Sequence, residues 1–193
     1  GVDLLTESLA ITVGDVNDAP VRTAGNPPAI TVAEDSANTT AASLGLSGLA
    51  YSVGGGADEA GQSLTYTLTA IPAHITVWLA DGTTQVTAGT TLSLAQLQGL
   101  TYKTVADSVG TGNLTWTVQD DGGTAGGGVD LLTESLAITV GNVNDQPIRT
   151  AGNPVAINVA EDSANTTATS LGLSGLAYSV GGGADEAGQS LTY

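Results

Sequence analysis

The sequence repeats itself after 127 residues, and this repeat limits the possible folds more than any other feature. Residues 1–66 align without gaps on residues 128–193, and 60 of these 66 positions are identical. A period of this length is too long for a solenoid, whose repeats have roughly 20–45 residues, and matches the size of a whole domain. We therefore expect a string of similar domains, of which residues 20–145 form one complete copy.

The segments on either side of this copy are interpreted as parts of its neighbours. Residues 1–19 are predicted to be the last strand of a preceding repeat followed by a linker, and residues 146–193 the first part of the next repeat. The second copy ends on "LTY", where the first copy continues as "LTYTLTA". We therefore expect both ends to be cuts within a longer tandem array, in which neighbouring identical repeats are the partners of each copy.

Apolar and polar residues alternate along the complete copy, as they do in strands with one buried face. The stretches 64–70, 113–119 and 135–140 place large apolar residues on one side and mostly threonine or other small polar residues on the other. Turns rich in Gly, Asp and Asn separate such stretches, which indicates an all-β fold of tandem immunoglobulin-like antiparallel β-sandwich domains. One helical turn is expected at 93–100. Further strands are expected within 29–34, 48–53, 74–80 and 99–104, and the residues expected to face the core are Leu64, Tyr66, Leu114, Trp116, Ile138 and Val140.

The composition argues against several classes of function. The chain has 19 acidic and 3 basic residues, and a net charge of −16 argues against binding to nucleic acid or to anionic membranes. No apolar stretch is long enough to span a bilayer, so no direct membrane insertion is expected. The one histidine, His74, is expected at the surface or in a turn, because no nucleophile–base pair surrounds it. We therefore expect that the protein is not an enzyme.

Most acidic residues fall in turns that are expected at the ends of a copy. Crowded carboxylates repel one another unless a cation neutralises them, and Ca²⁺ accepts roughly six to eight oxygen ligands in loose geometry. Oxygen-rich turns without cysteine favour Ca²⁺ over zinc or copper. The alternative is that these residues are ordinary solvated turn residues, because Asp and Asn favour turns in any case. The candidate ligands are Asp15, Asn17, Asp18, Glu34, Asp35, Asp58, Glu59, Asp120, Asp121, Asn144, Asp145, Asp185 and Glu186.

Several motifs, and the order in which they occur, resemble those of cadherin repeats. "DVNDAP" (15–20) and its second version "NVNDQP" (142–147) resemble the cadherin linker. "AED" (33–35), "ADEAGQSLTY" (57–66) and "QDDGG" (119–123) are similar, in this order, to motifs of bacterial cadherin-like and VCBS-type tandem repeats of giant RTX-like surface adhesins. The resemblance covers the whole unit and implies cadherin-like domains with Ca²⁺ at the joints between them.

The resemblance also implies which residues meet at each joint. The linker supplies ligands, a glutamate comes from the preceding domain, and two acidic turns come from the following domain. Asn142 replaces Asp15 in the second linker, which implies a weaker site there. The first joint would join Asp15, Asn17 and Asp18 to Asp58, Glu59 and either Asp120 or Asp121. The second joint would join Asn144 and Asp145 to Glu34 of the preceding domain and to Asp185 and Glu186 of the following one.

The expected function is that of a structural extender in a secreted bacterial adhesin at the cell surface, which supports surface attachment and biofilm. Near-identical neighbours favour a spacer, because length is gained by copying one domain. Two alternatives remain open at this point. The repeats could each have a weak carbohydrate- or cell-binding site that acts by avidity, or they could be subunits of an extracellular filament or sheath that associate laterally.

Overall fold

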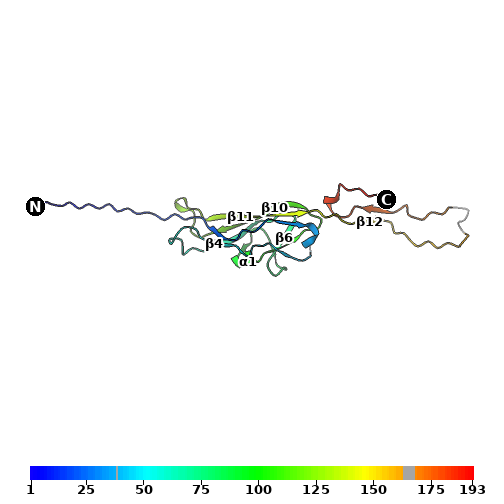
Figure 1. Cartoon of the computed structure of the whole chain (residues 1–193), viewed down its shortest axis with the longest axis horizontal. Coiled ribbons are helices and arrows are strands. Elements are labelled where there is room, and N and C mark those ends of the chain that lie inside the picture. Colours follow the sequence, from blue (N-terminus) through cyan, green and yellow to red (C-terminus); the bar gives the residue numbers. More distant parts are fainter. Residues whose placement is uncertain (38, 163–167) are drawn as a thin grey trace.

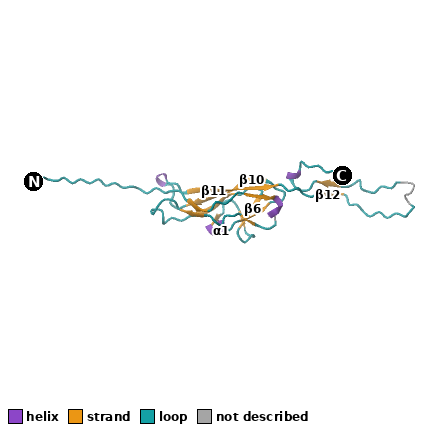
Figure 2. Ribbon diagram, in the orientation of Figure 1, coloured by secondary structure: helices purple, strands orange, loops and turns teal. Residues whose placement is uncertain are grey.

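The structure is built from strands and short helical turns, with an extended segment at each end of a central body (Figure 1). The computed structural model describes residues 1–37, 39–162 and 168–193. Strands make up most of the regular structure (Figure 2), which confirms the expected all-β class. None of the helices in these described ranges has the length and apolar character that crossing a membrane requires.

Five strands form the larger sheet, whose centre is a long antiparallel pair. The strands, in their order across the sheet, are β2 (Ile30–Ala33), β11 (Leu131–Gly141), β10 (Gly110–Gln119), β5 (Thr65–Ala70) and β8 (Thr91–Leu92). In the central pair, Gly110 lies opposite Val140 and Gln119 lies opposite Leu131. The apolar residues at every second position of β10 and β11 turn to the same face, as the alternation predicted.

One pair in this sheet is parallel, so the expectation of a wholly antiparallel arrangement is wrong at this point. β2 and β11 run in the same direction, with Ile30 beside Ile138 and Ala33 beside Gly141. A hairpin cannot join parallel neighbours, because such strands need a long crossover. Here almost the whole copy separates the two strands, since β2 is the first strand of the sheet in the sequence and β11 is the last.

A second sheet packs against the first over one shared hydrophobic core. Its strands, in order, are β3 (Ala42–Ser43), β9 (Thr101–Thr104), β6 (Ile75–Trp78) and β7 (Gln85–Val86). Val77 and Tyr102 of this sheet belong to the same buried cluster as Trp116 of the larger sheet. The prediction of the core-facing residues is confirmed, since Tyr66, Leu114, Trp116, Ile138 and Val140 are buried and Leu64 is half-buried against them.

A short helix, α1 (Leu94–Gln98), closes over one side of the core and confirms the helical turn expected at 93–100. Ser93 caps it, because its Oγ accepts from the backbone N–H of Gln96 at 3.2 Å while the Gln96 side chain accepts from the backbone N–H of Ser93 at 2.9 Å. Leu97 and Leu100 are fully buried. The helix is therefore held both by its cap and by the burial of Leu97, and the buried Leu100 holds the chain directly after it.

His74 lies in the turn before β6, as expected, but it is not at the surface. Only 6% of the residue is exposed, so of the two expected places, the surface or a turn, the turn is the one confirmed. Its backbone carbonyl accepts from the N–H of Val105 at 3.0 Å, which folds the turn against the body. A Cβ at Gly110 would lie 3.1 Å from the His74 Nδ1, so the glycine leaves room for the imidazole.

A two-stranded pair occurs in both copies and keeps the same register. In the first copy β1 (Val21–Ala24) pairs with β4 (Ala50–Ser52), and in the second copy β12 (Ile148–Ala151) pairs with β13 (Ala177–Ser179). Both pairs are antiparallel with an irregularity at the same step. The described residues also form three short 3₁₀ turns, namely η1 (Glu34–Ala37), η2 (Ala125–Gly127) and η3 (Ala184–Glu186).

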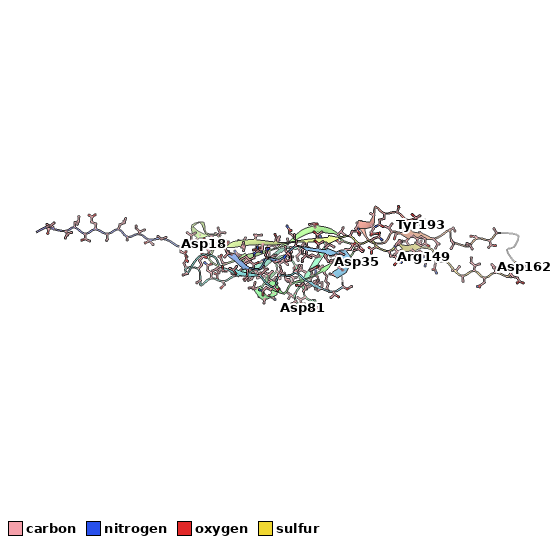
Figure 3. The ribbon with its side chains drawn as sticks, viewed as in Figure 1. Asp18, Asp35, Asp81, Arg149, Asp162 and Tyr193 are labelled. Atoms are coloured by element: carbon pink, nitrogen blue, oxygen red, sulfur yellow. The ribbon has the colours of Figure 1, made fainter. Side chains whose placement is uncertain are left out.

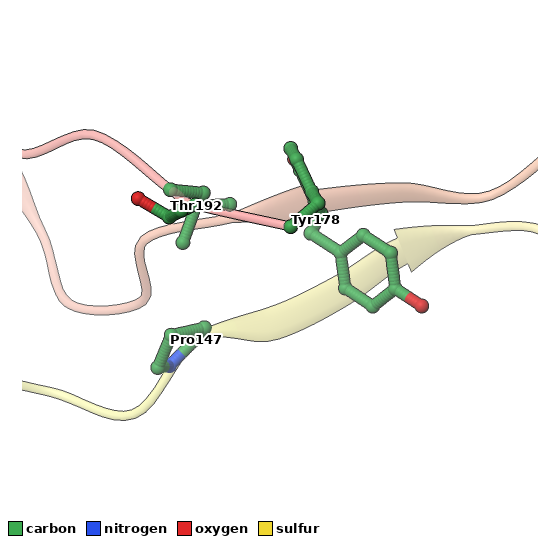
Figure 4. A pocket seen from close by; sticks show the side chains of 5 residues that line it. Pro147, Tyr178 and Thr192 are labelled. Atoms are coloured by element: carbon green, nitrogen blue, oxygen red, sulfur yellow. The ribbon is translucent and has the colours of Figure 1, made fainter.

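A pair of tyrosines is present in each copy but is covered in the first copy alone. The rings of Tyr51 and Tyr66 lie 5.7 Å apart, and the Trp116 Nε1 donates to the Tyr51 hydroxyl at 3.0 Å. The equivalent rings of Tyr178 and Tyr193 lie 5.8 Å apart and line an open pocket (Figure 4). The second tyrosine pair is therefore more exposed than the first, with Tyr193 at 91% against 7% for Tyr66.

Residues 1–13 form no strand, although the same sequence at residues 128–140 enters β11. Their large apolar side chains are all exposed, with Ile11 the least exposed at 79% and Val2 the most at 91%. Residues 1–13 pair with no strand among the described residues, so their assignment to the last strand of a preceding repeat stays a prediction, as do the other domain boundaries.

Candidate functional site

The candidate ligands gather around two linkers, one at each end of the central body. The first linker is residues 14–20 and the second linker is residues 141–147. Figure 3 labels Asp18, in the first linker, and Asp35, one of the acidic residues near the second linker, at opposite ends of the body. The strands of the body therefore keep the two groups apart, and each is described in turn.

Asn17 fastens the first linker to the turn between β10 and β11. Its Nδ2 donates to the Asp120 Oδ1 at 2.9 Å and to the Val129 carbonyl at 2.8 Å. Its Oδ1 accepts from the Gln62 Nε2 at 2.7 Å. The predicted ligand Asn17 is thus buried and engaged in hydrogen bonds through both ends of its amide. The lack of a side chain at Gly122 permits this, because a Cβ there would overlap the Asn17 amide.

Two buried carboxylates face the first linker. Glu59 is 0% exposed, and its Oε1 accepts from the backbone N–H of Asp18 at 2.5 Å. Asp120 is 4% exposed, and its Oδ1 also accepts from the N–H of Gly122 at 3.0 Å. The Glu59 Oε2 and the Asp120 Oδ2 are buried and accept no hydrogen bond from any described residue. A buried carboxylate oxygen without a donor is costly, so these two atoms are suited to a cation.

The remaining acids of this group lie nearer the solvent. Between the two candidates Asp120 and Asp121, Asp120 meets the linker, whereas the Asp121 Oδ1 accepts from the N–H of Ser63 at 3.0 Å. The hydrogen bond between the carboxyl groups of Asp15 and Asp58 raises the pKa of Asp15 and lowers the pKa of Asp58. Two carboxyl groups that form a hydrogen bond with each other share a proton, and a cation between them could replace it.

The second linker is held from both sides by glutamates. The Glu34 Oε1 accepts from the N–H of Val143 at 2.7 Å, and the Glu186 Oε1 accepts from the N–H of Asp145 at 3.0 Å. Glu34 belongs to the complete copy and Glu186 to the second copy, and both are 0% exposed. The Glu34 Oε2, the Glu186 Oε2 and the Asp145 Oδ2 are buried and have no partner in the part of the chain that the structure describes.

The charges around the second linker shift the pKa values of two of its carboxyl groups. The N–H of Val143 lowers the pKa of Glu34, but burial and the charges of the neighbouring carboxylates act against it, and the pKa is raised overall. Burial raises the pKa of Asp145, and the charges of Asp35 and Asp107 raise it further. Both groups therefore hold a proton more strongly than usual, because burial and the neighbouring carboxylates disfavour their negative charges.

Asp107 is part of this group, and sequence reasoning missed it. It lies between β9 and β10 with a positive φ of 54°, a conformation that Asp adopts more readily than most residues. A Cβ at Gly183 would lie 2.7 Å from the Asp107 Cβ, so this aspartate packs against the turn that precedes η3. No motif marked Asp107, and its acidic side chain in a predicted turn was the one available signal.

Asn142 and Asn144 differ from their equivalents in the first linker. The Asn142 Nδ2 donates to the Asp185 Oδ2 at 3.0 Å, in the place where Asp15 meets Asp58. Asn144 is exposed, and its Nδ2 donates to the neighbouring Asp145 carbonyl at 3.1 Å. The equivalent of Asp120 that would bury Asn144 is not among the 193 residues.

Two glycines make room for the carboxylates in both copies. Gly55 and Gly182 are equivalent and have positive φ angles of 43° and 47°. A Cβ at Gly55 would lie 2.6 Å from the Glu59 Oε2, and a Cβ at Gly182 would lie 2.6 Å from the Asp145 Oδ2. The same turn thus forms a glycine-lined recess beside a buried glutamate at each linker, and in the second linker Asp145 enters it too.

The residues present fit Ca²⁺ in kind but do not form a finished site. The donors are hard oxygens, several of them buried and unsatisfied, as Ca²⁺ prefers. Among the described residues, no three His, Asp or Glu side chains are placed so that together they could hold a metal ion. Within these 193 residues each linker meets only part of the predicted set, because the equivalent of Glu34 for the first linker and that of Asp120 for the second lie outside them.

Comparison with known proteins adds no family to these observations. No protein-family model matches the chain, and no curated protein matches it.

Proposed function

We propose that the chain is a stretch of stalk from a secreted bacterial surface adhesin, in which each copy is a structural extender and Ca²⁺ stiffens the joints. The observation that supports this best is the second linker. There, Glu34 of one copy and Glu186 of the next hold neighbouring backbone amides, and each keeps a buried oxygen without a partner among the described residues. A linker that is hydrogen-bonded to both copies can fix the orientation of one copy relative to the other.

The arrangement assigns separate tasks to the residues of a joint. Glu34 and Glu186 each position the linker through one oxygen. Since no three described acidic side chains already form a cluster that could hold an ion, Ca²⁺ would have to draw the second oxygens of these glutamates and of Asp145 together. Asp35, Asp107 and Asp185 add negative charge around them. Without a cation these charges repel one another, so the copies should swing apart. Bound Ca²⁺ would stabilise the joint by mass action, by roughly 2.7 kcal/mol when the free ion is a hundred times the dissociation constant.

Near-identity of the copies supports the structural role. A surface that recognises one ligand needs a single specialised domain, whereas reach is gained by repeating the same domain, here with 60 of 66 positions unchanged. The recurrence of the linker contact at both positions, from Asp18 to Glu59 and from Asp145 to Glu186, supports a joint that is rebuilt with each copy.

Calcium titration of the 193-residue chain tests the proposal. Calorimetry should detect binding in the range of about 10⁻⁴–10⁻³ M that is usual for extracellular modules. Small-angle scattering should show a larger maximum dimension in Ca²⁺ than in EGTA. The double variant Glu34→Gln with Glu186→Gln should lose most of the binding and the change in dimension at the second linker.

A matched control removes the same charge elsewhere. Glu7 and Glu161 are exposed glutamates of the incomplete copies, so Glu7→Gln with Glu161→Gln should bind Ca²⁺ as the parent chain does. Equal binding by both double variants would show that calcium is only a diffuse counter-ion, and the joint proposal would then be abandoned.

A further inference from the structure

The outer face of the larger sheet has no charged side chain on any of its five strands. In β10 the residues Leu114, Trp116 and Val118 point into the core, so the residues between them point outward. The one acid in these strands, Glu134, is on the inward side and pairs with Arg22 at 3.3 Å. We call the outward residues the threonine face, and its threonines are Thr31, Thr65, Thr67, Thr69, Thr91, Thr111, Thr115, Thr117, Thr133 and Thr139.

The threonines line up across the strands. Thr67 lies opposite Thr91 on one side and Thr117 on the other, and Thr117 lies opposite Thr133. A second row places Thr139 between Thr111 and Thr31. Neighbouring strands are about 4.8 Å apart, so the rows bring hydroxyl and methyl groups together at a regular spacing.

Several hydroxyl groups on this face bond to each other. The Oγ1 atoms of Thr69 and Thr115 are 2.8 Å apart, and those of Thr111 and Thr139 are 3.2 Å apart. A hydroxyl that already has a partner loses less when water is removed from it, because the main cost of burying a polar group arises when it is left unsatisfied. The threonine face can therefore be covered at a lower cost than its polar composition suggests.

The charge of the chain indicates what could cover such a face. With a net charge of −16, two copies repel each other when their acidic turns meet. The threonine face lets two copies touch without bringing carboxylates together. Its shape also suits a second copy, because two twisted sheets pack face to face at an angle of about 30° that their twist sets.

We propose that the threonine face is the surface through which two copies of this chain pack side by side, sheet against sheet. The strands cover roughly 500 Å² per copy, judged from strand lengths and spacing, which is below the roughly 800 Å² per partner of stable complexes. A single pair of domains therefore associates weakly, and longer arrays gain strength by making several such contacts at once. The inference concerns the complete copy alone and does not depend on calcium or on the stalk proposal.

Sedimentation velocity of the 193-residue chain over a wide concentration range tests this, in EGTA and at two salt concentrations. The parent chain should associate reversibly, and more strongly at the higher salt concentration because salt screens the repulsion between acidic chains. The variant Thr67→Glu with Thr117→Glu, which adds two charges at the centre of the face, should stay monomeric. Circular dichroism should confirm that the variant is folded.

The control adds the same two charges to the other sheet. Gln85→Glu with Thr87→Glu, at exposed positions in and after β7, should associate as the parent chain does. A parent chain that stays monomeric at every concentration overturns the proposal. So does association that the Thr67 and Thr117 variant retains, which would be assigned instead to the exposed apolar residues 1–13.

Discussion

Residues 1–13 and 128–140 have the same sequence, yet the first segment is extended and exposed while the second enters the centre of a sheet. The difference lies in what each segment can reach. Residues 131–141 pair with β10 on one side and β2 on the other, whereas the chain holds no second β10 for residues 1–13. Alternation of apolar and polar residues thus allows a segment to form a strand. The strand forms only where a partner strand is within reach.

The next part of the repeat shows the opposite behaviour. The pair β1 and β4 recurs as β12 and β13, and the contact from Asp18 to Glu59 recurs from Asp145 to Glu186. These contacts join residues close in the sequence, 41 positions apart for the linker contact, so both partners of each contact lie within the 193 residues. The hydrophobic core needs strands from the far end of the copy, and it forms once.

Substituting the same leucine in each copy would test this difference most strongly. Leu44 is 1% exposed and Leu171, its equivalent, is 67% exposed. Leu44→Ala should therefore lower the free energy of unfolding by about 2–5 kcal/mol, and Leu171→Ala should leave it almost unchanged. Urea unfolding followed by tryptophan fluorescence measures this, since both tryptophans, Trp78 and Trp116, lie in the complete copy. Equal losses would mean that the second copy shares the core.

The two equivalent glutamates Glu34 and Glu161 give a smaller effect that depends on pH. The pKa of Glu34 is raised above 4.5, so in EGTA its contribution to stability is complete below pH 4.5 and is lost as the pH rises through the raised value. Glu34→Gln cannot titrate and should remove this part of the fall in melting temperature between pH 4 and pH 7.

Glu161→Gln is the control for this prediction. Glu161 is exposed, and residues 162–193 contain no further linker for it to contact, so its substitution should leave the pH profile of the melting temperature as it is. If the melting temperatures of the two variants depended on pH in the same way, the contact between Glu34 and the linker would not contribute to the pH dependence of stability.

The smallest effect concerns the one acidic difference between the linkers. Asn142 donates to Asp185 at 3.0 Å, whereas Asp15 meets Asp58 as a second carboxyl group. In EGTA at pH 7, Asp15→Asn should raise the melting temperature slightly by supplying a donor. Asn142→Asp should lower it by adding a like charge. Scanning calorimetry of both variants would contradict this if the two shifts had the same sign.

Much of the fold was predictable from the alternation of residue types. Tyr66, Trp116 and Ile138 face the core as expected, because a pattern of period two fixes which side of a strand is apolar. The same pattern does not say which strand lies beside which, so the parallel pairing of β2 with β11 was not foreseen. The two-residue strands β3, β7 and β8 are too short to show a period.

The candidate site was predictable where a motif marked it and not elsewhere. The repeated linker and its acidic turns indicated Glu34, Glu59 and Glu186, and the structure places all three against linker amides. Asp107 was missed, because its place depends on a positive φ and on a glycine of the next copy. Nor could the sequence indicate that hydrogen bonds engage both ends of the Asn17 amide.

The parallel pair β2 and β11 also determines how the complete copy resists a stretching force applied to its two ends. The chain enters the body at the first linker and leaves it at the second, at the opposite end. Tension on the two ends therefore draws β2 one way and β11 the other, along the strand axes. The backbone hydrogen bonds between Ile30–Ala33 and Ile138–Gly141 are then loaded in shear at the same time, and they do not break one after another.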